Sequence, residues 1–104
     1  MEASRTVRIR NRHGLHARPA AEFVKISSRF EATITVEKDG MEVNGKSIMG
    51  VMMLAAECGS VISIRAVGPD GPEAVEALCA LVDGQFGEEE TLTGEPGEQG
   101  REGP

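Results

Sequence analysis

Residues 6–21 have the sequence TVRIRNRHGLHARPAA, in which the spacing of apolar residues changes from every second position to a helical spacing. The first five residues alternate polar and apolar side chains, which is typical of a half-buried strand. From Ala17 onward apolar residues recur at helical spacing, so we expect a helix over residues 17–28. Gly14 lies between the two and allows a tight turn. The stretch therefore predicts a strand, a glycine turn and a helix in immediate succession.

The start of this helix has a chemistry of its own. The first N–H groups of a helix have no partner within it, and its N-terminus carries a partial positive charge, so such an end favours a bound anion, above all phosphate. We expect the backbone amides of Ala17 and Arg18 to be the phosphoryl-binding donors. The Arg18 guanidinium can also hold phosphate oxygens through two parallel bonds, and Pro19 costs little in the first turn. An imidazole at this position, that of His16, predicts a histidine that accepts and passes on a phosphoryl group.

Three further segments have the pattern of strands. Residues 32–37 alternate and are rich in β-branched side chains. The Asp-Gly pair at residues 39–40 predicts a hairpin turn, and a short strand over residues 41–43 or 41–44 follows it. Residues 61–67 are the clearest strand in the sequence.

Two further helices complete the predicted order. Ser47 is a suitable N-cap for a short helix that runs to about residue 56, and Gly59 is expected to close that helix. Pro72 suits the first position of a last helix, whose apolar residues lie three or four apart: Val75, Leu78, Val82 and Phe86. The order βαββαβα predicts an α+β fold, an open-faced two-layer sandwich with a four-stranded antiparallel sheet and helices on one face.

Charge divides the 104 residues unevenly. Residues 1–30 hold seven basic and two acidic residues, which would steer acidic partner surfaces toward them. Residues 88–104 hold six acidic residues and one basic residue, and they are rich in glycine and proline. We therefore expect one folded domain over residues 1–87 and a disordered acidic tail over residues 88–104.

Composition also excludes several classes of function. No apolar run is long enough to cross a membrane, and the N-terminus has no signal-peptide pattern, so a cytoplasmic protein is expected. Neither a basic helix face nor a set of stacking aromatic residues favours binding of nucleic acid. Cys58 and Cys79 match no zinc spacing, and we expect no metal and no cofactor. Cys79 is expected in the core, and Cys58 partly exposed.

The segment Gly14-Leu15-His16-Ala17-Arg18-Pro19-Ala20 resembles the active-site motif of the HPr family, the histidine phosphocarriers of the bacterial phosphoenolpyruvate-dependent phosphotransferase system. Residues 46–54, KSIMGVMML, resemble that family's regulatory serine region, and the resemblance runs from about residue 5 to about residue 86. It implies the same architecture, with the first and last helices side by side. It also implies that enzyme I donates a phosphoryl group to Nδ1 of His16 and that enzyme IIA domains receive it during sugar transport. The chain would be a monomeric carrier and not an enzyme.

The same resemblance implies regulation at Ser47. In Gram-positive and some other members of the family, the matching serine is phosphorylated by an ATP-dependent HPr kinase/phosphorylase. A phosphate adds a charge of about −2, which should repel acidic partners from this surface.

An apolar docking surface is expected beside the active histidine. The family residues that match Ile48, Met49 and Met52 form such a surface, and we assign Leu15 to it as well. The residues alone point the same way, because a short helix with this many apolar side chains cannot bury all of them on one face. We expect Val51 and Leu54 in the core instead.

His13, in the glycine turn, is expected to add only local polarity or a contact with a partner.

One alternative to the carrier remains. The chain could be a regulatory HPr-like module that acts by binding, in a nitrogen-type phosphotransferase branch or as a transcriptional co-effector. The presence of His16 favours carriage, because a dedicated regulator would be expected to lose the histidine.

Overall fold

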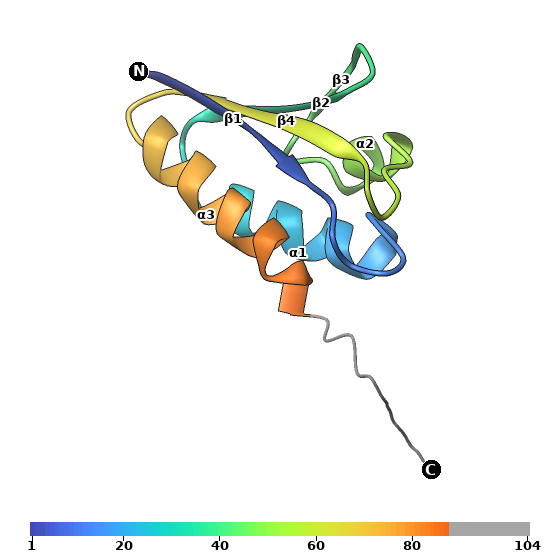
Figure 1. Cartoon of the computed structure of the whole chain (residues 1–104). Helices are drawn as coiled ribbons and strands as arrows, with labels where there is room; N and C mark the ends of the chain where they lie inside the picture. The colour runs from blue at the N-terminus through green and yellow to red at the C-terminus, as the bar shows by residue number, and fades with distance from the viewer. Residues whose placement is uncertain (88–104) are drawn as a thin grey trace.

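Four antiparallel strands form a single sheet in the order β1-β4-β2-β3 (Figure 1). The strands are β1 (Glu2–Arg8), β2 (Thr33–Lys38), β3 (Met41–Asn44) and β4 (Val61–Val67). The structure is a computed structural model and describes residues 1–87, so the tail expected over residues 88–104 lies outside the described residues.

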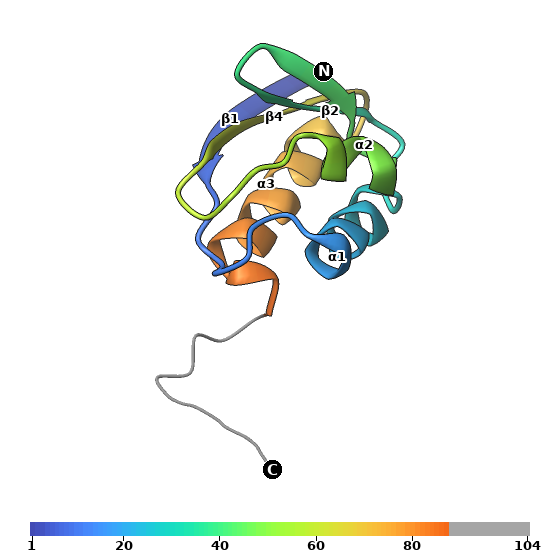
Figure 2. The ribbon, with the colours of Figure 1, turned by 90° about the vertical axis from the view of Figure 1, so that its right-hand side faces the viewer.

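Three helices cover one face of this sheet. They are α1 (Ala17–Ser27), α2 (Ile48–Met53) and α3 (Gly71–Asp83), and a 3₁₀ turn, η1 (Gln85–Gly87), follows α3. Helices α1 and α3 lie side by side beneath the sheet, and the short α2 lies at one end, against α1 (Figure 2). The expected order βαββαβα and the open-faced α+β sandwich are therefore confirmed.

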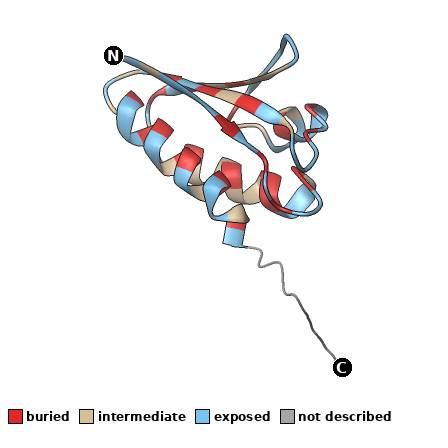
Figure 3. Cartoon of the chain, viewed as in Figure 1, coloured by how far each residue is buried: buried red, intermediate tan, exposed pale blue. Residues whose placement is uncertain are grey.

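The core lies between the sheet and the helices. On β4, Ile62, Ile64 and Ala66 are fully buried, while the residues between them face away from the helices (Figure 3). Phe23 of α1 and Leu78 of α3 are buried against that inner face. Each large apolar side chain buried in this way stabilises the fold by roughly 1.5–3 kcal/mol. The alternation seen in the sequence thus becomes the two-layer structure.

The first strand begins earlier than its alternation predicts. It spans Glu2–Arg8 because it pairs along the whole of β4, from Glu2 opposite Val67 to Arg8 opposite Val61. Most residues of β1 are exposed, so its sequence has no hydrophobic alternation over residues 2–5 from which the strand could be predicted. The length of β1 is set by its pairing with β4 and not by the alternation of its own side chains.

The end of α2 also differs from the prediction. The helix stops at Met53 with Leu54 as its C-cap, and Ala55 adopts a left-handed conformation with φ of 51°. Gly59 does not close the helix; its amide donates to the Ile9 carbonyl at 2.8 Å. The glycine therefore belongs to a contact between two loops.

The last helix is shorter than its apolar pattern predicts. It ends at Asp83, and Phe86 lies in η1, where Gln85 and Phe86 both have positive φ. This left-handed turn brings the Phe86 ring back into the core. Cys79 is buried on α3, as expected, and burial raises the pKa of its thiol.

Candidate functional site

The loop that leads into α1 lies against the loop that follows α2. The Leu15 amide donates to the Ala56 carbonyl at 2.9 Å, and the Ile9 amide donates to the Ser60 carbonyl at 2.8 Å. Gly14 has φ of 69°, and a Cβ atom added there would collide with the Ala56 carbonyl oxygen. Only glycine satisfies both the turn and this close approach.

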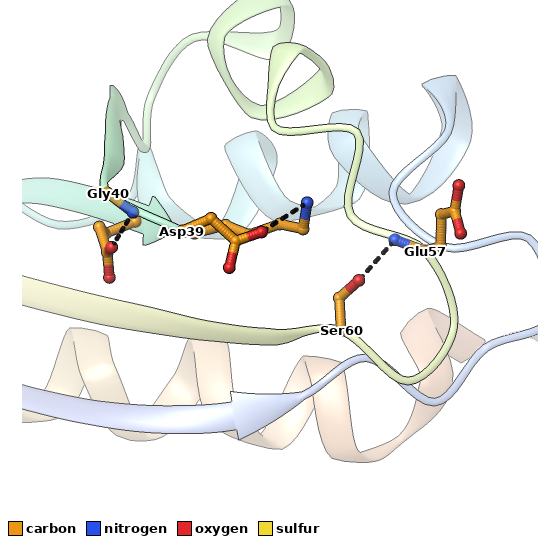
Figure 4. A network of polar contacts seen from close by, with 6 residues as sticks. Asp39, Gly40, Glu57 and Ser60 are labelled. Atoms are coloured by element: carbon orange, nitrogen blue, oxygen red, sulfur yellow. Dashed lines mark hydrogen bonds and ion pairs between the residues drawn. The ribbon is translucent and has the colours of Figure 1, made fainter.

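Polar contacts support the second of these loops. The Glu57 amide donates to Ser60 Oγ at 2.9 Å, which closes the turn at its tip (Figure 4). The same view shows the hairpin between β2 and β3, where the Gly40 amide donates to Glu37 Oε2 at 2.6 Å. The loop after α2 is therefore a defined support for the residues before α1.

A buried asparagine holds the turn from inside. Asn11 is fully buried, and its side-chain Nδ2 donates to the Gly14 carbonyl at 2.7 Å. The backbone carbonyl of Asn11 accepts from the Gly14 amide at 3.2 Å. No role for Asn11 was predicted from the sequence. An asparagine three residues before a glycine is a turn signal that could have identified it, because asparagine side chains bond to nearby backbone groups.

His16 is the N-cap residue of α1. Its backbone is extended, with φ of −77° and ψ of −172°, and its carbonyl accepts the first intrahelical bond, from the Ala20 amide at 2.9 Å. The amides of Ala17 and Arg18 precede that bond, so no carbonyl of α1 can accept from them. The His16 side chain makes no capping bond, and its residue is half-buried, whereas Ala17 and Arg18 are exposed. Imidazole, helix amides and guanidinium thus come from one accessible helix end.

His13 lies closer to this site than expected. Its ring packs against that of His16, with 5.8 Å between the ring centroids and an angle of 84° between the planes. From the sequence, His13 was expected to add only local polarity or a contact with a partner, and its contact with the His16 ring was not predicted. The three-residue spacing of the two histidines does not reveal this contact, because the backbone conformation of Gly14 decides whether their side chains meet.

Positive charge surrounds the site along the chain. Residues 5–21 include five arginines and no acidic residue, and Arg10, Arg12 and Arg18 are all exposed. Such a concentration of one sign attracts anionic ligands and acidic protein surfaces.

Ser47 caps α2, as predicted. Its Oγ accepts from the Gly50 amide at 3.0 Å, and its backbone is extended, with φ of −116° and ψ of 119°. Helix α2 packs against α1 and lies at the same end of the molecule as the loop that leads into α1 (Figure 1).

The exposed apolar side chains of α2 form what we call the α2 patch: Ile48, Met49, Met52 and Met53, with exposed fractions of 42%, 74%, 40% and 64%. Val51 and Leu54 are buried, as expected. Leu15 differs from the expectation: its side chain is 4% exposed and belongs to the core, so it offers a partner little surface. Its side chain packs with the core while its amide bonds to the neighbouring loop.

Within residues 1–87, no group of three or more histidine, cysteine or acidic side chains is placed to hold a metal ion. Over the same residues, no helix combines the length and the apolar character needed to cross a bilayer. Cys58 is exposed, and its Sγ lies 3.6 Å from the Arg10 carbonyl oxygen.

Comparison with known proteins decides the family. A family model described as "PTS HPr component phosphorylation site" matches residues 3–83. The chain belongs to the HPr family. It is 48% identical over 85 residues to the phosphocarrier protein HPr of Treponema pallidum (strain Nichols), a match that covers 82% of this chain and 97% of that protein.

Solved structures of the HPr family share the fold. The crystal structure of HPr-C-His from Thermoanaerobacter tengcongensis matches with a TM-score of 0.81 and 49% identity, over 84% of this chain and 98% of that one. The crystal structure of Crh, the Bacillus subtilis catabolite repression protein, matches with a TM-score of 0.66 and 47% identity, over 76% of this chain and 91% of that one. That Crh structure is described as a domain-swapped dimer, so the monomeric state expected for this HPr-family chain stays a prediction.

Proposed function

We propose that His16 accepts a phosphoryl group from phosphorylated enzyme I and passes it to enzyme IIA domains in sugar transport by the phosphotransferase system. The observation that carries this proposal is the position of His16 as the accessible N-cap of α1, directly before two amides that no carbonyl of the helix can engage. We infer a cytoplasmic place of action and no cofactor for this relay.

The proposed transfer is a displacement at phosphorus. The lone pair of Nδ1, the nitrogen that the family resemblance implies, attacks the phosphoryl group, and the N–P bond forms as the bond between phosphorus and the donor breaks. The Arg18 guanidinium and the amides of Ala17 and Arg18 stabilise the charge on the equatorial oxygens. Catalysis of this kind consists mainly of positioning and electrostatics. Transfer to an enzyme IIA domain returns His16 to its starting form, so the chain acts as a carrier and not as an enzyme.

The α2 patch is the proposed docking surface, with Ile48, Met49 and Met52 as its main contacts. These side chains are exposed on a helix that packs against α1, so a partner that covers them also reaches the start of α1. Methionine side chains adapt to different shapes, which suits a carrier that meets a donor and several acceptors. The arginines before α1 favour partners with acidic rims.

Ser47 is the proposed regulatory site for an HPr kinase/phosphorylase. It lies directly before the α2 patch, so a phosphate on its Oγ would place about two negative charges on the docking surface. The phosphate oxygens would still face the N-terminus of α2, where negative charge is favoured, so α2 should remain formed. Docking of acidic partners would weaken while the fold persisted.

A regulatory HPr-like module is the second candidate, and the similarity to Crh supports it. In that function the chain would act through Ser47 and the α2 patch by binding, without sugar transport. The retained His16 favours carriage. Phosphoryl transfer from this chain to an enzyme IIA domain supports the carrier, whereas binding to a partner without any transfer supports the module.

The test is incubation with enzyme I and phosphoenolpyruvate, followed by mapping of the acid-labile phosphoryl group. We expect one adduct, on His16, and none in His16→Ala, which should fold normally because the side chain is half-exposed. Ser47→Ala is the matched control and should keep the acid-labile label. An acid-labile adduct that persists in His16→Ala would refute the assignment.

A further inference from the structure

His13 and His16 are brought together by a short segment whose backbone is fixed. Between them lies Gly14, whose amide and carbonyl both bond to Asn11, and Leu15, whose amide bonds to the loop after α2. Each of these bonds is 3.2 Å or shorter. The Cα positions of the two histidines therefore do not drift relative to each other as those of an open loop would.

The two rings meet in a geometry that aromatic pairs prefer. Their centroids are 5.8 Å apart and their planes are nearly perpendicular, at 84°, so the edge of one ring faces the plane of the other. Such pairs are favourable beyond the area that they bury. His13 is exposed, so core packing does not force this contact on it. The contact is a property of the turn itself.

We propose that His13 is a positioning residue for His16: its ring restricts rotation of the His16 ring at the start of α1. This inference rests on the proposed function of His16 as the phosphoryl acceptor. An attacking nitrogen must lie in line with the bond that breaks, and a half-exposed ring that rotates spends part of its time in orientations that cannot react. The His13 ring raises the fraction of time that the His16 ring spends in reactive orientations, both in the unphosphorylated protein alone and in its complexes.

The experiment uses a donor that has no docking surface. Phosphoramidate ion is a small phosphoryl donor, so its rate with the full chain reports the His16 ring and not contact with enzyme I. The variants are His13→Ala, which removes the ring, and His13→Phe, which keeps an aromatic edge and face without ring nitrogens. We expect His13→Ala to slow phosphorylation of His16 by about two- to tenfold, the factor that matches the strength of such a ring pair, and His13→Phe to restore most of the rate.

A spectroscopic measurement tests the contact without phosphoryl transfer. Long-range ¹H–¹⁵N spectra report the environment of the His16 ring nitrogens, and ring-to-ring nuclear Overhauser effects report the packing. We expect His13→Ala to shift the His16 ring signals while backbone amide signals away from residues 11–18 stay in place. Unchanged His16 signals in His13→Ala would overturn the proposal.

The remaining outcomes are also decisive. If His13→Ala slows transfer from enzyme I but not from phosphoramidate, His13 is a docking contact and the positioning role is wrong. If His13→Phe is as slow as His13→Ala, the ring nitrogens act and the aromatic contact does not. A phosphoryl group mapped to His13 would make it a second acceptor and would overturn positioning. If His16 accepts no phosphoryl group from either donor but its ring signals shift in His13→Ala, the proposed function fails and the ring contact stands.

Discussion

The N-termini of α1 and α2 use the same backbone chemistry in opposite ways. At α2, Ser47 Oγ accepts from the Gly50 amide, so the helix satisfies one of its own first donors. At α1, the His16 side chain makes no capping bond to the helix. Helix α2 and the start of α1 lie at one end of the molecule (Figure 1), yet only α2 is capped by the side chain of its own N-cap residue.

Length and burial explain this difference. Helix α2 has six residues, of which Val51 alone is buried, so it has little packing to hold it and needs its cap. Helix α1 has eleven residues and buries Phe23, Ala20 and others against the sheet and α3. Packing of an apolar face supplies most of a helix's stability in a protein. Helix α1 therefore depends less on a side-chain cap for its stability than α2 does.

The largest expected effect comes from breaking the loop that presents α1. Gly14→Ala should lower the free energy of unfolding by about 3 kcal/mol, because the new Cβ atom collides with the Ala56 carbonyl oxygen at a positive φ. Gly40→Ala is the matched control: Gly40 also has positive φ, but nothing lies near its added Cβ atom. It should cost only about 1 kcal/mol. Urea unfolding of both variants measures the difference, and equal losses would show that the contact with Ala56 contributes nothing.

Removal of one amide from the start of α1 tests its proposed contact with the phosphoryl group. Ala17→Pro deletes the N–H group, while proline is well tolerated at the first helical position and the extended His16 is compatible with a following proline. Phosphorylation of His16 by enzyme I should slow by about tenfold or more, since a hydrogen bond to a charged group is lost. Circular dichroism should show the helix intact. A wild-type rate in a folded Ala17→Pro would mean that this amide does not contact the phosphoryl group.

Removal of the cap from α2 should have a smaller effect, and on stability alone. Ser47→Ala should lower the free energy of unfolding by about 1 kcal/mol, because the Gly50 amide loses its acceptor. Ser47→Asp keeps an acceptor at the N-cap and should recover that loss while it weakens binding of acidic partners to the α2 patch. Urea unfolding and titration calorimetry with enzyme I separate the two effects. Stability lost equally in both variants would contradict the capping role.

The smallest expected effect concerns the third helix start. Asp70, the N-cap residue of α3, makes no side-chain bond to its own helix; its carboxylate accepts from the amides of Glu31 and Ala32, both at 2.9 Å. The bond from the Glu31 amide is the main cause that lowers the Asp70 pKa below its ordinary value of 3.8.

The sign of the pH effect follows from that lowered pKa. The carboxylate stabilises the fold fully above the unfolded-state value of 3.8, and this stabilisation is lost as pH falls through the lower folded-state value. Asp70→Asn should therefore be less stable than the wild type at pH 7, and the gap should narrow at the acid end. Urea midpoints across pH 2 to 7 measure it, and a gap that widened in acid would contradict the assignment.

The local features of this protein were predictable because local patterns carry them. Alternating side chains predicted β2 and β4 to within a residue or two, and helical spacing predicted α1. Ser47 was identified as a cap from its residue type and position alone. The resemblance to the HPr family was also recognised from the segment around His16, because a motif of residue types at fixed spacing can be read without the three-dimensional structure.

Features that depend on contact between distant segments were decided by the tertiary structure. The length of β1 comes from its pairing with β4, and the burial of Leu15 comes from its packing in the core, beside a loop distant in sequence. The early end of α2 and the contact between His13 and His16 likewise depend on backbone turns. Periodicity reports only neighbours along the chain. The amino-acid sequence by itself therefore determined the helices, most of the strands and the family motif around His16, whereas packing between loops decided which residues surround His16.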